Sequence, residues 1–131
     1  MDAGQEGYSG YTIHLIDITN SIDPTYKGSL QSLPGYTRSV SLFKKNNQVY
    51  ALVGQDNGTS NAPSGILRIL NVTHPEEPYQ EGMLEIGSDI VSVAALSENW
   101  AAFISGTYVL PYYSLQLSLV NIENPAAPYI S

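Results

Sequence analysis

The chain has 131 residues, of which 43% are hydrophobic, and this is enough to build one ordinary domain with a core. Its net charge of -7, with only five Lys and Arg residues, excludes the clustered basic surface that a nucleic-acid partner requires. Cysteine is absent, which excludes disulfides, cysteine nucleophiles and thiolate metal sites.

The N-terminal residues 1–10 contain three glycines and show no periodicity, so we expect a flexible lead-in. This acidic segment lacks the apolar core of a signal peptide. No later run approaches the roughly 18 apolar residues that are needed to span a bilayer. We therefore expect a soluble chain without a membrane span.

A strand pattern rich in branched apolar residues covers residues 11–18, and two later runs align with it. The aligned apolar positions are Ile13 with Leu67 and Leu117, and Leu15 with Ile69 and Leu119. The positions between them hold His14, Arg68 and Ser118. A period of two with one apolar face predicts three strands that each turn one face toward a core.

Each of these runs ends in the same spelling, an Asn or Asp followed seven residues later by Pro. The repeat markers are Asp17, Pro24, Asn71, Pro75, Pro78, Asn121, Pro125 and Pro128. The side-chain oxygen of Asn or Asp can accept a hydrogen bond from a backbone amide ahead of it, and proline favours an extended link. We therefore expect one turn type in all three copies.

Further strands complete each repeat. Short strands at residues 26–30 and 80–84 follow the marker segments and carry Gly28 and Gly82 at the same place, 54 residues apart. Residues 39–43 match 90–94, and residues 49–53 match 100–104, both at an offset of 51, with hairpin turns expected at 44–47 and 97–99. The pattern predicts four antiparallel strands in each unit of 50 to 54 residues, close to the period of a propeller blade.

The marker segments 15–20, 69–75 and 119–125 resemble the LVIVD-type repeat, in which an apolar strand is followed by Asp, Val or Ile, Ser or Thr, Asn or Asp, and Pro. The resemblance covers nearly all of residues 11–131, and it implies a β-propeller of the kind found in bacterial and archaeal secreted or cell-surface proteins. Two features depart from that family: the marker is Asn in two copies, and the spacing exceeds about forty residues.

The fold prediction is an all-β run of antiparallel four-stranded propeller blades, with a β-sandwich as the alternative. We expect the second half of one blade at residues 11–33, a complete blade at 34–85 and most of a further blade at 86–131, nine strands in all. The excess length falls at residues 56–64 and 106–114, where insertions are expected. Such a piece leaves open strand edges, so we expect residues 115–120 of one copy to meet residues 11–15 of another.

The sequence offers few residues for chemistry. His14 and His74 occupy different places in the repeat and have no converging partners, which favours structural or exposed roles. Residues 56–61 lack the alternating ligands and closing Glu of a calcium loop, and the acidic residues at 76, 77, 81 and 85 are typical of a solvated edge. No catalytic residues, metal ligands or cofactor are predicted. Sequons at Asn57 and Asn71 leave glycosylation open.

Aromatic residues in the second expected insertion form the candidate binding surface. Tyr108, Tyr112 and Tyr113 surround Pro111, and they suit contact with carbohydrate or protein unless they cover the edge of their own sheet. In a propeller this insertion lies on the same face as the links at 34–38 and 87–89. The candidate binding residues are Tyr36, Arg38, Asp89, Tyr108, Tyr112 and Tyr113.

Three functions follow from these patterns. The first is a non-catalytic extracellular or cell-surface scaffold that binds a protein partner or other copies of itself through open blade edges. The second is a carbohydrate-binding module that uses the tyrosine-rich insertion. The third is a fragment of a larger propeller enzyme. The low charge and ten tyrosines favour the surface setting, and the fold alone does not separate the three functions.

Overall fold

The computed structural model describes residues 11–57, 62 and 64–131, so the predicted lead-in at residues 1–10 lies outside the described residues. Regular structure in this part of the chain consists of ten β-strands, one more than the nine expected. Their bounds are β1 Tyr11–Asp17, β2 Thr25–Leu33, β3 Tyr36–Lys45, β4 Gln48–Asp56, β5 Gly65–Asn71, β6 Tyr79–Ile86, β7 Asp89–Ala95, β8 Trp100–Val109, β9 Tyr112–Asn121 and β10 Tyr129–Ile130. The additional strand is β10, which pairs with the end of β9.

The strands form three antiparallel sheets, which confirms the all-β prediction. One sheet is the hairpin β1-β2, and the other two have the orders β3-β4-β5-β6 and β10-β9-β8-β7. Strands that follow one another in the chain are therefore neighbours in each sheet. Among the described residues there is no helix long and apolar enough to cross a membrane.

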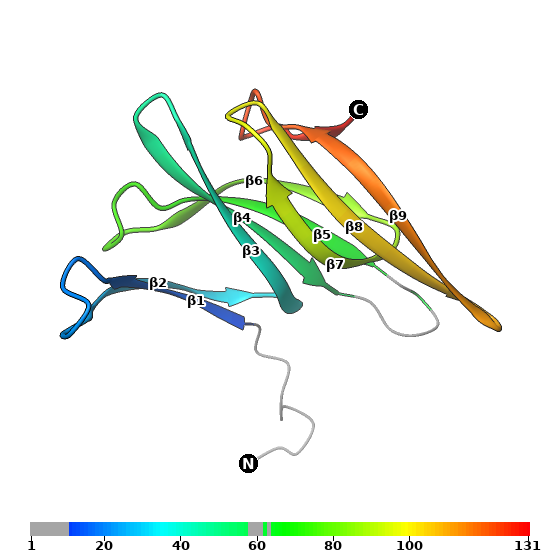
Figure 1. Ribbon diagram of the computed structural model, residues 1–131, viewed down its shortest axis with the longest axis horizontal. Coiled ribbons are helices and arrows are strands. Elements are labelled where there is room, and N and C mark those ends of the chain that lie inside the picture. The colour runs from blue at the N-terminus through cyan, green and yellow to red at the C-terminus, as the bar shows by residue number, and fades with distance from the viewer. Residues whose placement is uncertain (1–10, 58–61, 63) are drawn as a thin grey trace, which may run out of the picture.

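The sheet β3–β6 is the middle of three layers and is packed on both faces (Figure 1). On one face a cluster that includes Val53 and Leu70 packs against Ile13 and Leu15 of the hairpin. On the other face a larger cluster joins Leu67 and Ile69 to residues of β7–β10 such as Phe103 and Val120. The described part of the chain is thus a stack of open sheets, with three layers instead of the two of a sandwich.

Polar contacts between the middle sheet and the sheet β7–β10 provide hydrogen-bond acceptors for backbone amides at the edge of β7. The backbone N–H of Val93 donates to Ser39 Oγ at 3.2 Å, and that of Ala95 donates to Ser41 Oγ at 3.0 Å. Because β7 is the last strand of its sheet, these amides have no strand beside them to accept their hydrogen bonds. Serine side chains of the neighbouring layer take the place of that strand.

The three marker segments adopt the same turn. Asp17, Asn71 and Asn121 each accept a hydrogen bond through Oδ1 from the backbone N–H two residues ahead, at 2.8, 3.1 and 2.9 Å. A backbone hydrogen bond of 2.9 to 3.2 Å then closes a tight turn at the same place in each copy. The predicted side-chain capping of these turns is confirmed.

The residue ten positions after the marker accounts for the choice between Asp and Asn in the first two copies. Asp17 forms an ion pair with Lys27 at 3.7 Å, and hydrogen bonds from Thr19, more than this charge, lower its pKa below the ordinary value. In the second copy the corresponding partner is Glu81, which accepts from Asn71 Nδ2 at 3.1 Å. An Asp at position 71 would lose this donor and place two carboxylates together, so the marker is matched to its partner.

Both interfaces between layers contain the same close approach of a turn to a glycine. A Cβ atom added to Gly28 in β2 would lie 2.1 Å from the carbonyl oxygen of Pro75. A Cβ atom added to Gly82 in β6 would lie 2.0 Å from the carbonyl oxygen of Pro125. In each case the marker turn of one layer lies directly over the outer strand of the layer before it, and only glycine leaves room for it.

The register corrects the alignment of β4 with β8. Tyr50 pairs with Asn71 and Trp100 pairs with Asn121, so the two strands correspond at an offset of 50 instead of 51. Side chains alternate between the faces of a strand, and a shift of one residue therefore exchanges the faces. Phe103 consequently packs against the middle sheet, whereas Ile104 points to the opposite face and is 36% exposed.

The expected division of each strand into a core face and a mixed face holds only in part. Leu117 and Leu119 were expected in the core, but they are 68% and 46% exposed because no layer covers that face of β9 within the described chain. Arg68 was expected on the mixed face, and it is buried because the middle sheet is covered on both sides. Its guanidinium donates to Gln55 Oε1, Gln80 Oε1 and the Pro34 carbonyl, and burial lowers its pKa.

The second expected insertion is a long hairpin. Residues 106–109 continue β8, residues 112–114 begin β9, and pairs such as Tyr108 with Tyr113 join them around a turn at Leu110 and Pro111. The expected insertion at 56–64 lies partly outside the described residues. Its base is closed by a 2.7 Å hydrogen bond from Asn57 N–H to the Ser64 carbonyl.

We expect the substitution Gly82→Ala to destabilise the protein by about 1 to 3 kcal/mol, because the new methyl group forces the Pro125 turn away from β6. Urea unfolding of the two proteins measures this difference. Gly87→Ala is the matched control, since no atom lies within 4 Å of a Cβ atom at that position. Equal unfolding free energies for the two variants would contradict the role of Gly82 in the interface.

We expect Asn71→Asp to cost about 1 to 3 kcal/mol at neutral pH, because it removes the amide donor and places a carboxylate beside Glu81 at a buried position. The reverse exchange, Asp17→Asn, is the control and should have little effect.

Because the folded pKa of Asp17 is lowered, the stability that its charge adds is present at neutral pH and lost as the pH falls through that pKa. The small difference between Asp17→Asn and the natural protein should therefore vanish in acid, as urea unfolding at both pH values will measure.

Candidate functional site

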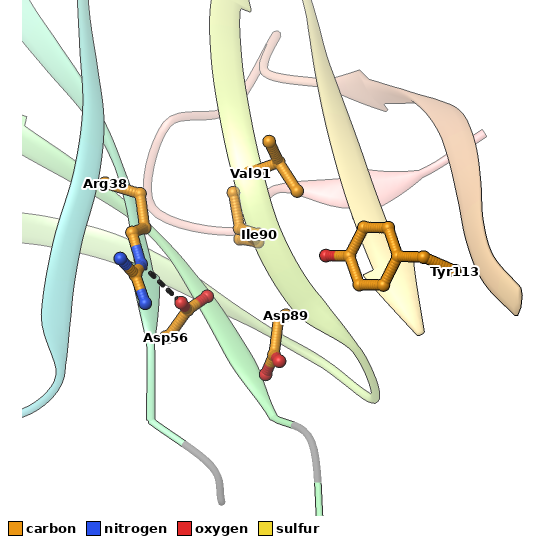
Figure 2. Close-up of a pocket in the computed structure, with 6 residues that line it drawn as sticks. All are labelled: Arg38, Asp56, Asp89, Ile90, Val91 and Tyr113. Carbon is orange, nitrogen blue, oxygen red and sulfur yellow. Dashed lines mark hydrogen bonds and ion pairs between the residues drawn. The ribbon is translucent and has the colours of Figure 1, made fainter. Parts of the chain in front are cut away.

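One end of the two larger sheets brings together three of the six candidate binding residues. The meander places the start of β3, the end of β4, the start of β7 and the start of β9 at this end. Arg38, Asp89 and Tyr113 line one cavity of about 400 Å³ there, together with Asp56, Ile90 and Val91 (Figure 2). We call this cavity the strand-end pocket. Tyr36, Tyr108 and Tyr112 are exposed and are not part of its lining.

The polar wall of the strand-end pocket centres on Asp56, the last residue of β4. Its residue exposure is only 8%, and its Oδ2 atom accepts a hydrogen bond of 2.5 Å from Nε of Arg38. The Oδ1 atom is buried and accepts no hydrogen bond from any residue that the structure describes. Figure 2 shows this carboxylate between the guanidinium of Arg38 and the side of the pocket formed by β7.

Two β-bulges shape the mouth of the pocket. The pairing of β3 with β4 shifts between Thr37 and Ser39, so Arg38 is the extra residue of a bulge. The pairing of β7 with β8 shifts in the same way between Ile90 and Ser92, which makes Val91 the corresponding residue. The bulges align β3 with β7 at an offset of 53 instead of the 51 expected from the sequence. A bulge redirects its side chain, and both redirected residues line the pocket.

Tyr113 reaches the pocket by lying across a glycine. Its hydroxyl would be 2.0 Å from a Cβ atom built on Gly106 of β8, so the ring occupies the space that any other side chain at position 106 would fill. A cross-strand aromatic residue that covers a glycine is a known device for holding a ring against a sheet. The glycine therefore fixes where the phenol group points.

The remaining candidate positions do not converge. His14 and His74 are both exposed and belong to different segments, and His14 contacts the ring of Tyr26 at a centroid distance of 6.0 Å. Within the described residues no group of three or more His, Asp or Glu side chains could hold a metal ion. The calcium-loop pattern at 56–61 lies mostly outside the described residues, as does part of the Asn57 sequon.

Two apolar faces at opposite sides of the stack form a second candidate surface. The C-terminal apolar face consists of Ile104, Leu115, Leu117 and Leu119 on the side of β8 and β9 away from the middle sheet. It borders a hollow of about 100 Å³. The N-terminal apolar face consists of Ile16 and Ile18 at the end of β1. All six side chains are 36% exposed or more.

Sequence reasoning missed Asp56 because it lies at the start of a turn-like stretch of polar residues, where it was interpreted as turn chemistry. Its ion pair with Arg38 joins residues 18 positions apart and depends on the bulge. The C-terminal apolar face was recognised as an apolar pattern but was placed in the core.

Comparison of the chain with protein-family models, with curated proteins and with solved structures finds no match. The resemblance to the LVIVD-type repeat therefore stays a prediction.

We expect Gly106→Ala to displace the Tyr113 ring from the strand-end pocket with little loss of stability, because a side-chain tip can move more easily than a backbone. Nuclear Overhauser contacts between the Tyr113 ring and the Hα atoms of residue 106 measure the position of the ring. They should be strong in the natural protein and in a Gly87→Ala control. Persistence of the same contacts in Gly106→Ala would show that the glycine does not place the ring.

Proposed function

We propose that this chain is a run of β-propeller blades that acts as a non-catalytic structural and protein-interaction module. In this proposal the two apolar faces bind further sheets of the same kind, supplied by other copies of the chain. An extracellular or cell-surface setting is part of the proposal, and it rests on the composition and on the resemblance to LVIVD-type repeats. The same chain order of strands in both four-stranded sheets supports the blade interpretation.

The observation that carries the proposal is that the residues exposed on the outer layers occupy the same repeat positions as core residues of the middle layer. Through their pairing with β4 and β8, Leu67 corresponds to Leu117 and Ile69 corresponds to Leu119. Leu67 and Ile69 have no exposed surface because the sheet β7–β10 covers them. The C-terminal apolar face thus has the composition of a face that another sheet covers, and apolar patches of this kind mark interaction sites.

The N-terminal apolar face has the complementary character. By the marker alignment, Ile16 corresponds to Leu70 and to Val120, and Ile18 corresponds to Val72 and to Ile122. The four residues in the middle and last sheets are at most 8% exposed, because each packs against the layer before it. Ile16 and Ile18 have no such layer and are 57% and 72% exposed.

Serine side chains on β3 and β7, the first strands of the two four-stranded sheets, also support stacking of a further layer on the C-terminal apolar face. Ser39 on β3 binds the backbone of Val93 in the next layer, and the bulge alignment places Ser92 of β7 at the position of Ser39. Ser92 lines the hollow beside the C-terminal apolar face. The edge strand of a further layer on this face could therefore donate a backbone hydrogen bond to Ser92, as β7 does to Ser39.

Such stacking joins two different surfaces and is therefore head-to-tail. Contacts of this kind close into a ring if the rotation between copies allows it, and otherwise continue as a filament. The edge of β9 adds a second attachment, because β10 pairs with only Val120 and Asn121 of that strand. The expected contact between residues 115–120 and residues 11–15 of another copy pairs strand edges within one sheet and does not stack two faces. It is therefore a separate contact and stays a prediction.

We expect the intact chain to self-associate at micromolar concentration and the substitution Leu117→Lys to weaken this association strongly, because it buries a charge in an apolar interface. Sedimentation velocity measures the size distribution. The control is Ile22→Lys, which changes an apolar residue that is 93% exposed in a marker turn outside both faces. A stable monomer of the intact chain would contradict the proposal.

A mixture of variants provides the sharper form of this experiment. Ile16→Lys blocks the N-terminal apolar face, and Leu117→Lys blocks the C-terminal apolar face. Each variant alone should sediment as a monomer, while an equimolar mixture should form one-to-one dimers through the two intact faces. Dimers formed by either variant alone would indicate a symmetric contact and exclude the head-to-tail arrangement.

A further inference from the structure

We propose that the strand-end pocket binds a small ligand through a protonated amino group. This inference is independent of the proposed stacking of sheets, because the pocket lies at the end of the strands and shares no residue with either apolar face.

The acceptor atoms of the pocket carry the inference. Asp56 is buried, and its Oδ1 atom has no hydrogen-bond donor among the described residues. Leaving a buried carboxylate oxygen without a donor is costly, so the site favours a ligand that supplies one. A second carboxylate, Asp89 at the start of β7, is half-buried and lines the same cavity. An ammonium group offers three donors and can serve both carboxylates.

The charge balance of the pocket selects a cation over a neutral donor. Arg38 is the one cationic side chain in the lining, and it is already bonded to Asp56 through Nε. One guanidinium against two carboxylates leaves one uncompensated negative charge in a partly enclosed space. Coulomb attraction there is stronger than in bulk water, so a single positive charge on the ligand is favoured.

The remaining lining sets the size and the shape of the ligand. Ile90 and Val91 form an aliphatic wall, and Tyr113 adds an aromatic ring with a hydroxyl group. A cavity of about 400 Å³ is within the range of small-molecule sites, which are mostly apolar with a few fixed polar groups. The ligand class is therefore a primary amine with a short apolar portion, and the ring of Tyr113 is placed for contact with that portion or with the cation.

The test is a titration of the chain with n-butylammonium chloride at constant ionic strength, followed by methyl and amide chemical shifts. The Leu117→Lys variant is used, because it leaves the pocket lining unchanged and favours the monomer. We expect saturable shifts centred on Asp89, Ile90 and Tyr113. Neither 1-butanol nor butyrate should produce them, because the first lacks the charge and the second has the opposite charge.

Two variants distinguish the pocket from general attraction to an acidic protein. Asp89→Asn should weaken the binding of n-butylammonium about tenfold, the effect of losing one hydrogen bond to a charged group. Glu98→Gln removes the same charge from the exposed turn between β7 and β8 and should leave the affinity unchanged. Equal affinity in Asp89→Asn, shifts spread over the acidic surface, or equally strong binding of 1-butanol would each overturn the proposal.

Discussion

The burial of the sheet β3–β6 between two neighbouring layers is the constraint on which the rest of the structure depends. A sheet covered on both faces must be apolar on both, and β5 meets this demand except at Arg68 and at its last residue, Asn71. That guanidinium is retained in the interior because two glutamines and a backbone carbonyl accept its hydrogen bonds. The same burial requires the close approaches at Gly28 and Gly82, since layers in contact leave no room for a Cβ atom beneath a turn.

The interfaces between layers combine a nonspecific and a specific component. Apolar side chains form the core of both interfaces, and because the hydrophobic effect is non-directional they alone would allow one layer to slide over the next. The serine contacts to the edge of β7 and the marker turn over the glycine fix the position along both directions of the sheet. Because these contacts use backbone groups and small residues, they can recur in successive layers while the apolar residues vary.

The pocket and the apolar faces arise from opposite features of the same architecture. The apolar faces are exposed because the stack of described layers has two ends, and their residues correspond to core residues of the middle layer. The strand-end pocket lies where bulges in β3 and β7 turn Arg38 and Val91 away from the regular alternation, so that both side chains line it. The packing of successive layers therefore accounts for the apolar faces, and the bulges that interrupt regular strand pairing account for the strand-end pocket.

The sequence by itself determined the β class, the marker turns and the order of strands, because alternation, Asx turns and prolines act over a few residues. It placed Arg38, Asp89 and Tyr113 on one end of the fold, and the structure brings these three into one pocket. Only the tertiary structure decided which face of β9 is buried, since a one-residue offset in β8 and the presence of a covering layer leave no local signal. The role of Asp56 was equally hidden, because its partner is 18 residues away and reaches it through a bulge, whose position depends on how two strands pair.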